Sequence, residues 1–202
     1  MTKKIGVFGG TFDPIHLGHI AMVVALKEKH KLDHIIFIPA SINPLKTKKP
    51  LASQKHRLKM LKIALKDLPD CSISTIELKN DGPSFMVDTI RELKKKKNFK
   101  NSRFFLLMGE DLLEQFTSWK EPEELVRLAR PLIALRNNVT HNSKWQKNQI
   151  LKKAIEKGIT KTDLYDVSAT EVRLRLSKGL YCGHLVDIRV LNYIRRHGLY
   201  KQ

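Results

Sequence analysis

The sequence contains little cysteine and no long apolar run. Only Cys71 and Cys182 occur among its 202 residues, too few for a disulfide framework and without the spacing of a metal site. Although 42% of the residues are hydrophobic, no run approaches the length needed to span a membrane. Lys3 and Lys4 lead directly into a predicted strand, without the apolar segment of a secretory signal. We therefore predict a cytoplasmic protein with reduced thiols and no membrane partner.

Acidic residues are also scarce, with 20 against 38 basic residues and a formal net charge of +18. Such a balance is found in proteins that bind nucleic acid or membranes. Here the lysines are spread through amphipathic helices, and the run 94–97 lies at the end of a predicted helix, where the helix dipole favours cations. We interpret the charge as a solvated surface. A basic nucleic-acid-binding protein is the alternative interpretation.

The segment from Lys4 to Ala21 has the pattern of a strand, a glycine turn and a helix. Residues 5–8 form an apolar strand, and Gly9 and Gly10 permit a sharp turn and the close approach of a ligand. Pro14 keeps the chain extended, and a helical pattern begins at about Ile15. The free N–H groups of a first helical turn attract anions. The segment therefore predicts a phosphate site.

Two histidines strengthen this prediction. His16 and His19 are three residues apart, so their imidazoles project from one side of the first turn and can donate hydrogen bonds to phosphate oxygens. A metal-binding pair is the alternative, but no third and fourth ligand follows at zinc spacing. Two solvated histidines after an ordinary glycine turn would be the other explanation.

Apolar strands alternate with amphipathic helices along the rest of the chain. The patterns predict strands at 34–39, 72–78, 103–108, 131–136 and 163–167, and helices at 54–66, 84–95, 121–128, 145–157, 169–176 and 186–197. Repeated βα units predict an α/β fold with a doubly wound parallel sheet, helices on both faces, and a site at the carboxyl ends of the strands. We find no linker and expect a single domain over residues 1–202, with a helical C-terminal subregion from about 168.

Polar residues follow two of these strands. Asp111 comes shortly after the strand 103–108, at the end of the sheet where a site is predicted, although a helix N-cap would explain it equally well. Ser168, Thr170 and Arg173 open the helix that follows the last predicted strand. They offer hydroxyls, first-turn N–H groups and a bidentate guanidinium to phosphates. A plain N-cap and a surface arginine are the simpler interpretation of the second group.

The pattern Gly10-x-Phe12-x-Pro14-x-His16-x-Gly18-His19 resembles the N-terminal signature of the nucleotidylyltransferase superfamily. The longer string 9–19 is similar to the form found in nicotinate-nucleotide adenylyltransferases. Further segments resemble the same family: 82–89, Gly109-x-Asp111 with Trp119, 168–173 and 193–200. The resemblance covers nearly the whole chain except roughly 139–161. It implies a Rossmann-like fold and transfer of the adenylyl group of ATP to nicotinate mononucleotide, which gives deamido-NAD and pyrophosphate.

The resemblance also implies a role for individual residues. It assigns His16 and His19 to catalysis at the α-phosphate. It assigns ATP binding to Gly10, Thr11, Phe12, Gly109, Asp111, Ser168, Thr170 and Arg173, and acceptor binding to Lys46, Ser84, Thr89, Trp119 and Arg136. Trp119 would stack on the pyridine ring, although a core position explains an indole equally well. Mg²⁺ would accompany ATP without a dedicated protein ligand set.

Two segments depart from the family pattern. The common Pro-Pro-His-Lys is Asn43-Pro44-Leu45-Lys46 here, and the usual Arg-Pro-Gly is Arg136-Asn137-Asn138. Adenylyl transfer is unaffected by these changes, but the preference for nicotinate over nicotinamide mononucleotide is left open. A pantetheine-phosphate adenylyltransferase would share the N-terminal signature while lacking the segments at 82–89 and 109–119. The sequence also leaves open whether the chain forms a homo-oligomer and what residues 139–161 do.

Overall fold

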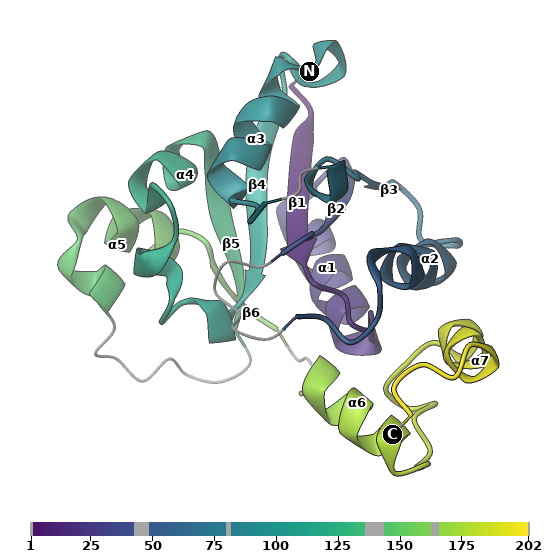
Figure 1. The fold of residues 1–202 in the computed structure, drawn as a ribbon. Helices are drawn as coiled ribbons and strands as arrows, with labels where there is room; N and C mark the ends of the chain where they lie inside the picture. The colour runs from purple at the N-terminus through teal and green to yellow at the C-terminus, as the bar shows by residue number, and fades with distance from the viewer. Residues whose placement is uncertain (1, 43–48, 80–81, 136–143, 163–165, 202) are drawn as a thin grey trace.

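The computed structural model describes residues 2–42, 49–79, 82–135, 144–162 and 166–201. Its centre is a six-stranded, wholly parallel sheet in the order β3-β2-β1-β4-β5-β6 (Figure 1). The strands are β1 (Lys4–Gly10), β2 (His34–Pro39), β3 (Cys71–Ile73), β4 (Arg103–Gly109), β5 (Ala129–Leu135) and β6 (Ile159–Lys161). This is the predicted Rossmann-like, doubly wound sheet.

Helices cover both faces of the sheet. They are α1 (Leu17–His30), α2 (Gln54–Ala64), α3 (Met86–Lys95), α4 (Pro122–Leu128), α5 (Gln149–Glu156), α6 (Ala169–Ser177) and α7 (Ile188–Arg196). Short 3₁₀ helices are η1 (Glu77–Lys79), η2 (Lys97–Phe99), η3 (Glu110–Leu112), η4 (Phe116–Ser118) and η5 (Lys144–Lys147).

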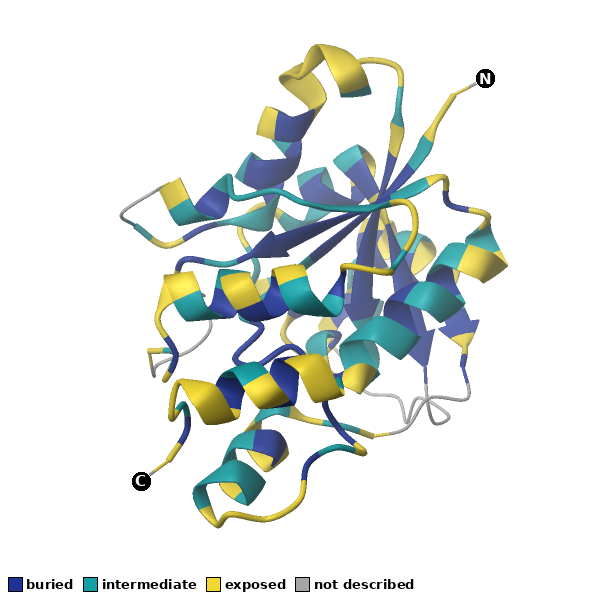
Figure 2. Cartoon of the chain, turned by 90° about the vertical axis from the view of Figure 1, so that its right-hand side faces the viewer, coloured by how far each residue is buried: buried dark blue, intermediate teal, exposed yellow. Residues whose placement is uncertain are grey.

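Alternation along the strands divides the core into two layers. In β4, Phe105 and Leu107 face the layer that contains α1, α2, α6 and α7. Phe104, Leu106 and Met108 face the layer that contains α3, α4 and α5. Because successive strand residues point to opposite faces, an almost unbroken apolar strand fills both layers, and Figure 2 shows the strands as the most deeply buried elements. Among the described residues, no helix is long and apolar enough to cross a membrane.

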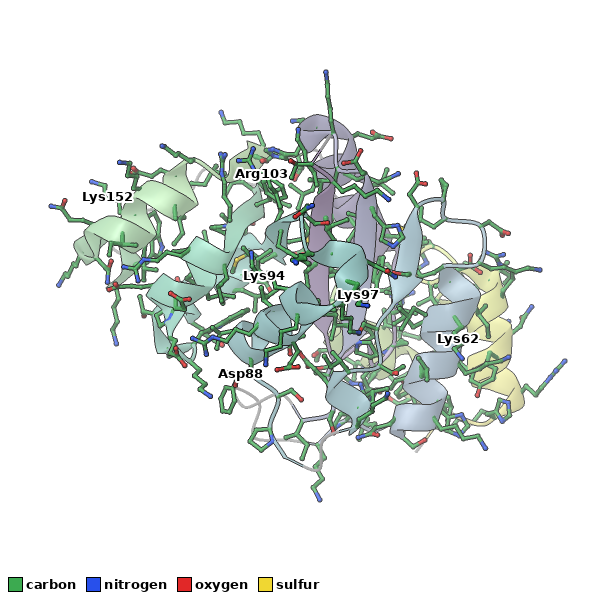
Figure 3. The ribbon with its side chains drawn as sticks, turned by 90° about the horizontal axis from the view of Figure 1, so that it is seen from above. Lys62, Asp88, Lys94, Lys97, Arg103 and Lys152 are labelled. Carbon is green, nitrogen blue, oxygen red and sulfur yellow. The ribbon has the colours of Figure 1, made fainter. Side chains whose placement is uncertain are left out.

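Basic side chains surround this core on separate elements. Figure 3 shows Lys62 on α2, Lys94 on α3, Lys97 on η2 and Lys152 on α5. The run 94–97 begins in the last turn of α3, as predicted. Its first two lysines therefore lie beside the free carbonyls of the helix end, which attract cations.

Two predicted strands are corrected. The strand expected over 72–78 stops at Ile73, because the chain turns after Ser74, whose N–H still donates to the Phe37 carbonyl, 2.9 Å away. Residues 77–79 then form η1. The last strand is Ile159–Lys161 rather than 163–167; residues 163–165 lie outside the described residues. Gly158 enables this pairing, because a Cβ there would collide with the Pro131 carbonyl oxygen.

Some element ends also differ from the prediction. Gly9 and Gly10 are the last residues of β1 rather than a turn after it. Helix α1 begins at Leu17, with His16 as its N-cap, and the N-cap of α3 is Phe85 rather than Ser84. The predicted helices at 121–128, 169–176 and 186–197 are present with small differences at their ends, whereas the helix predicted over 145–157 is divided at Asn148 into η5 and α5.

From β1 the sheet is extended first to one side, by β2 and β3, and then to the other side, by β4, β5 and β6. The order of the strands therefore switches between the neighbours β1 and β4. In open α/β sheets, ligands bind at such a switch point, beyond the carboxyl ends of the strands. Figure 1 places α6 and α7 near this end of the sheet. The C-terminal helices therefore lie beside the segment that contains the first signature.

Candidate functional site

The turn between β1 and α1, residues 11–16, contains most of the first signature. Phe12 adopts a left-handed conformation with φ of 50°, which costs a bulky residue free energy and needs tertiary support. Its ring is 2% exposed and packs edge-on against Phe8, with centroids 5.5 Å apart. The Asp13–Pro14 peptide bond is cis. Packing of Phe12 in the core therefore directs the turn toward the start of α1.

The two predicted catalytic imidazoles stack on one another. The ring centroids of His16 and His19 are 3.5 Å apart with an interplanar angle of 24°. The backbone N–H of His16 donates to Nδ1 of His19 over 3.2 Å. An accepting Nδ1 leaves the proton of a neutral His19 on Nε2, where it can be donated to a ligand.

His16 is the more enclosed of the pair. It is 6% exposed, and burial lowers its pKa from 6.5 to about 4, because a low-dielectric environment disfavours the charged imidazolium. Its Nδ1 is buried without a hydrogen-bond partner. His16 is therefore neutral at pH 7, and its imidazole can form hydrogen bonds without carrying a charge.

The family-like segment 168–173, called the second signature below, contacts the turn that contains the first signature. Arg173 on α6 donates from Nη1 to the backbone carbonyl of Asp13 over 2.7 Å and from Nη2 to the Thr170 hydroxyl over 3.1 Å. Ser168 is the N-cap of α6 and accepts from the Glu171 N–H over 3.1 Å. The two predicted phosphate segments, 160 residues apart, are therefore in direct contact.

Gly18 allows this close packing. A Cβ on Gly18 would lie 3.1 Å from Cβ of Val167 and 3.2 Å from Nδ1 of His16. Any larger residue would press on the segment just before Ser168 and on the imidazole together. Gly18, a residue of the first signature, therefore allows the segment that precedes Ser168 to pack closely against that signature.

The Gly-x-Asp motif lies at the end of β4, beside β1. Asp111 is exposed within η3, whose N-cap is Gly109 rather than Asp111. A Cβ on Gly109 would collide with Oδ1 of Asp111, so the carboxylate folds back over the glycine. The Asp111 carboxylate therefore occupies the space that a side chain at position 109 would fill, and it lies beside the end of β4.

Two of the predicted acceptor residues have a buried polar atom without a partner. Ser84 is 9% exposed, and its buried hydroxyl has no hydrogen-bond partner. Trp119 packs against Phe116 with centroids 5.2 Å apart, and its buried Nε1 also has no partner. Lys46 and Arg136 lie outside the described residues.

Thr89 has a partner within the protein. It is 6% exposed, and its hydroxyl donates to Oε1 of Glu77 over 2.7 Å. Burial raises the pKa of Glu77, while this hydrogen bond acts in the opposite direction. The hydroxyl of Thr89 therefore supports a buried carboxyl group instead of pointing into an open site.

Unpartnered polar atoms concentrate on the predicted site residues. Among the described residues, six buried side-chain nitrogen or oxygen atoms have no hydrogen-bond partner. Four of them belong to residues predicted from the sequence: Thr11, His16, Ser84 and Trp119. A buried unpaired polar group costs about 1–3 kcal/mol, so these atoms are suited to meeting a ligand.

Sequence reasoning missed three residues that support the turn. Asp13 is 5% exposed, and its carboxylate accepts from Tyr200 as well as from two backbone amides. Arg57 on α2 is 1% exposed and donates to the Thr11 carbonyl over 2.6 Å. Asp13 lies inside the first signature and Tyr200 inside the family-like segment 193–200, but neither pattern gives the residue a role, and no local pattern marks Arg57.

Comparison with known proteins agrees with these motifs. Residues 7–175 match the family model described as cytidylyltransferase-like. A protein of Dictyoglomus thermophilum named "Probable nicotinate-nucleotide adenylyltransferase" is 39% identical over 98% of this chain and 99% of its own length. A protein of the same name from Carboxydothermus hydrogenoformans is 36% identical over 98% of both chains.

Solved structures share the fold. The Plasmodium falciparum nicotinic acid mononucleotide adenylyltransferase complexed with NaAD aligns with a TM-score of 0.72 at 21% identity. The alignment covers 98% of this chain and 97% of that one. The same protein complexed with APC gives a TM-score of 0.71.

Proposed function

This chain belongs to the nicotinate-nucleotide adenylyltransferases of the cytidylyltransferase-like superfamily, and from that premise we propose how it transfers the adenylyl group of ATP to nicotinate mononucleotide. The products are deamido-NAD and pyrophosphate. The observation that supports this most directly is the contact between Arg173 and the Asp13 carbonyl, because it joins two phosphate-binding signatures into one site.

The reaction needs alignment more than acid–base chemistry. A phosphate oxygen of nicotinate mononucleotide attacks the α-phosphorus of ATP and forms the new P–O bond. The bond from the α-phosphorus to the bridging oxygen breaks, and that oxygen leaves with pyrophosphate. The second pKa of a phosphate monoester is about 6, so the nucleophile is already ionised at neutral pH. Positioning and stabilisation of the developing charge supply the catalysis.

The two histidines are assigned to the α-phosphate. A neutral His16 donates one N–H, and His19 donates from Nε2 while its Nδ1 accepts from the His16 backbone. Gly10 leaves room for the ring of Phe12, which a Cβ there would approach to 2.9 Å, and the amides of Thr11 and Phe12 are assigned to the phosphates as donors from the turn. Fixed donors directed at developing charge stabilise a transition state without reorganisation during the reaction.

The remaining ATP groups are assigned to the two motifs that flank the turn. Ser168, Thr170 and Arg173 hold the leaving pyrophosphate. Arg173 already uses one N–H on Asp13 and one on Thr170, and a guanidinium has five, so three are left for phosphate oxygens. Gly109 and Asp111 are assigned to the ribose, whose two hydroxyls match the two carboxylate oxygens.

The acceptor assignment rests on unpartnered atoms and on the family resemblance. We place the pyridine ring against Trp119 and assign the Ser84 hydroxyl to the acceptor, because both side chains have a buried polar atom without a partner. Thr89 is better explained as a support for Glu77 than as a direct ligand. Lys46 and Arg136 remain candidates for the acceptor from the resemblance alone.

Mg²⁺ is proposed to enter with ATP, held by phosphate oxygens and water, a common arrangement for this ion. The ion would neutralise phosphate charge. The described ranges contain no group of three histidine, cysteine or acidic residues that could hold a metal ion. We therefore assign it no residue of the chain, and no step above depends on it.

The wider setting is proposed as follows. Residues 1–202 form one domain with a helical subregion from about 168, and the protein works in the cytoplasm with free Cys71 and Cys182. Its partners are ATP and nicotinate mononucleotide, with no nucleic acid or membrane, and a homo-oligomer is compatible with this role. Binding to nucleic acid that persists at moderate salt would contradict this, because nonspecific binding weakens steeply with salt.

Pyrophosphate release tests the function directly. The protein is incubated with ATP and nicotinate mononucleotide, nicotinamide mononucleotide or phosphopantetheine in parallel. We expect the highest kcat/KM with nicotinate mononucleotide. His16→Ala should lower kcat by about 10²–10³, as for the loss of one oxyanion donor. A folded His16→Ala enzyme with wild-type turnover would refute the catalytic assignment.

A further inference from the structure

The carboxylate of Asp13 joins three distant parts of the chain. Its Oδ2 accepts from the Leu51 N–H over 2.8 Å, and its Oδ1 accepts from the Ala52 N–H over 3.0 Å. The Tyr200 hydroxyl donates to the same Oδ1 over 2.7 Å. The turn that leads to His16 is therefore held by the segment before α2 and by the segment after α7.

Tyr200 reaches Asp13 through an unusual backbone path. After α7, Gly198 has φ of 59° and Tyr200 has φ of 63°. A left-handed conformation is unfavourable for a bulky residue and persists only where surrounding contacts impose it. The ring is 9% exposed within the core layer of α1, α2 and α7. The backbone turns after α7, and this brings the Tyr200 hydroxyl to the carboxylate of Asp13.

The hydroxyl remains a donor under ordinary conditions. Burial raises the pKa of Tyr200, and the negative charge of Asp13 raises it further. A protonated phenol beside a carboxylate makes a charge-assisted hydrogen bond, which is stronger than a neutral one. Asp13 is therefore fixed by two amides and one phenol, which orient its side chain from different directions.

We propose that Tyr200 is a positioning residue for adenylyl transfer: through Asp13, its hydroxyl fixes the turn of residues 11–14 that meets the ATP phosphates. This inference rests on the proposed assignment of that turn to ATP. Asp13 provides the physical link, because its carboxylate binds Tyr200 while its carbonyl binds Arg173. One residue therefore couples the segment after α7 to the arginine assigned to pyrophosphate.

Tyr200→Phe is the principal test, because it removes the hydroxyl and keeps the ring. We expect kcat/KM for ATP to fall about tenfold, as for loss of a buried hydrogen bond to a charged group, with KM for nicotinate mononucleotide changed less than twofold. Tyr193→Phe is the matched control. It removes a phenol that contacts Nδ1 of His56 over 2.9 Å, so kcat/KM for ATP should be unchanged.

A double-mutant cycle with Asp13→Ala separates positioning from stability, because alanine removes the oxygen that accepts from Tyr200. If Tyr200 acts through Asp13, the double variant has the same kcat/KM for ATP as Asp13→Ala alone. Fully multiplicative losses would overturn the proposal. So would folded Tyr200→Phe or Asp13→Ala with kcat/KM for ATP within twofold of wild type. Circular dichroism at the assay temperature confirms folding. An inactive wild-type protein would instead refute the proposed function.

Discussion

Arg173 donates a hydrogen bond of 2.7 Å to the backbone carbonyl of Asp13, which lies 160 residues earlier in the chain. The bond places the guanidinium beside the turn that precedes α1. It leaves N–H groups of Arg173 available, so the same side chain can hold the turn and a phosphate together. The segments at the starts of the first and sixth helices, which we propose to bind phosphate, are therefore joined directly.

Replacing Arg173 by lysine keeps the charge and removes the planar fork. We expect kcat/KM for ATP to fall about 100-fold, because lysine cannot hold the turn and pyrophosphate in one geometry. KM for nicotinate mononucleotide should change little. Arg175→Lys, on the same helix, is the control: its guanidinium donates to the carbonyl of Tyr181, which lies after the end of α6. Equal losses in both variants would indicate a general effect on α6.

The burial of His16 predicts a pH dependence of stability. Its pKa is about 4 in the folded protein against 6.5 for an unperturbed histidine, so the unfolded chain binds more protons between these values. Stability therefore falls as the pH is lowered from 6.5 to 4, by up to about 3 kcal/mol from this group, and is unaffected by it above pH 7.

His16→Gln should remove that contribution. Chemical denaturation at pH 7 and pH 4.5 gives the free energy of unfolding, and the wild type should lose more stability than the variant between the two. His184→Gln, which removes an exposed imidazole, is the comparison. An identical pH profile for wild type and His16→Gln would show that the pKa of His16 is the same in the folded and unfolded chain, and would contradict its burial as a neutral imidazole.

Gly109 and Asp111 should behave as one unit. Gly109→Ala places a methyl group against Oδ1 of Asp111 and displaces the carboxylate, so KM for ATP should rise about tenfold, as for loss of hydrogen bonds to a charged group. Asp111→Ala should have a similar effect. Adding Gly109→Ala to Asp111→Ala should then raise KM for ATP only slightly further, because Oδ1 of Asp111, with which the methyl group would collide, is absent. Steady-state kinetics on the three variants measure this, and additive losses would contradict it.

Trp119→Ala should raise KM for nicotinate mononucleotide more than KM for ATP, because the indole is assigned to the pyridine ring. Trp145→Phe is the control, since Trp145 is 2% exposed in the same core layer and also has an unpartnered Nε1. It should lower the melting temperature without a selective change in either KM. A Trp119→Ala enzyme with equal changes in both KM values would make Trp119 a packing residue.

The sequence by itself determined the sheet class, the two phosphate signatures and the family. These depend on short-range patterns: alternation that fills two core layers, glycines at strand ends, and residue types at fixed spacing. It placed the last strand too late, because Ile159–Lys161 is short and its pairing depends on the close approach of Gly158 to Pro131.

Only the tertiary structure decided which side chains support the site. The roles of Arg57 and Tyr200 come from contacts with Thr11 and Asp13, and the hydroxyl of Thr89 is taken by Glu77. Residues so far apart in the chain leave no periodic signal, because their proximity arises when the helices close over the sheet. Local patterns therefore specify the elements and motifs, while long-range packing determines which groups remain free to meet a substrate.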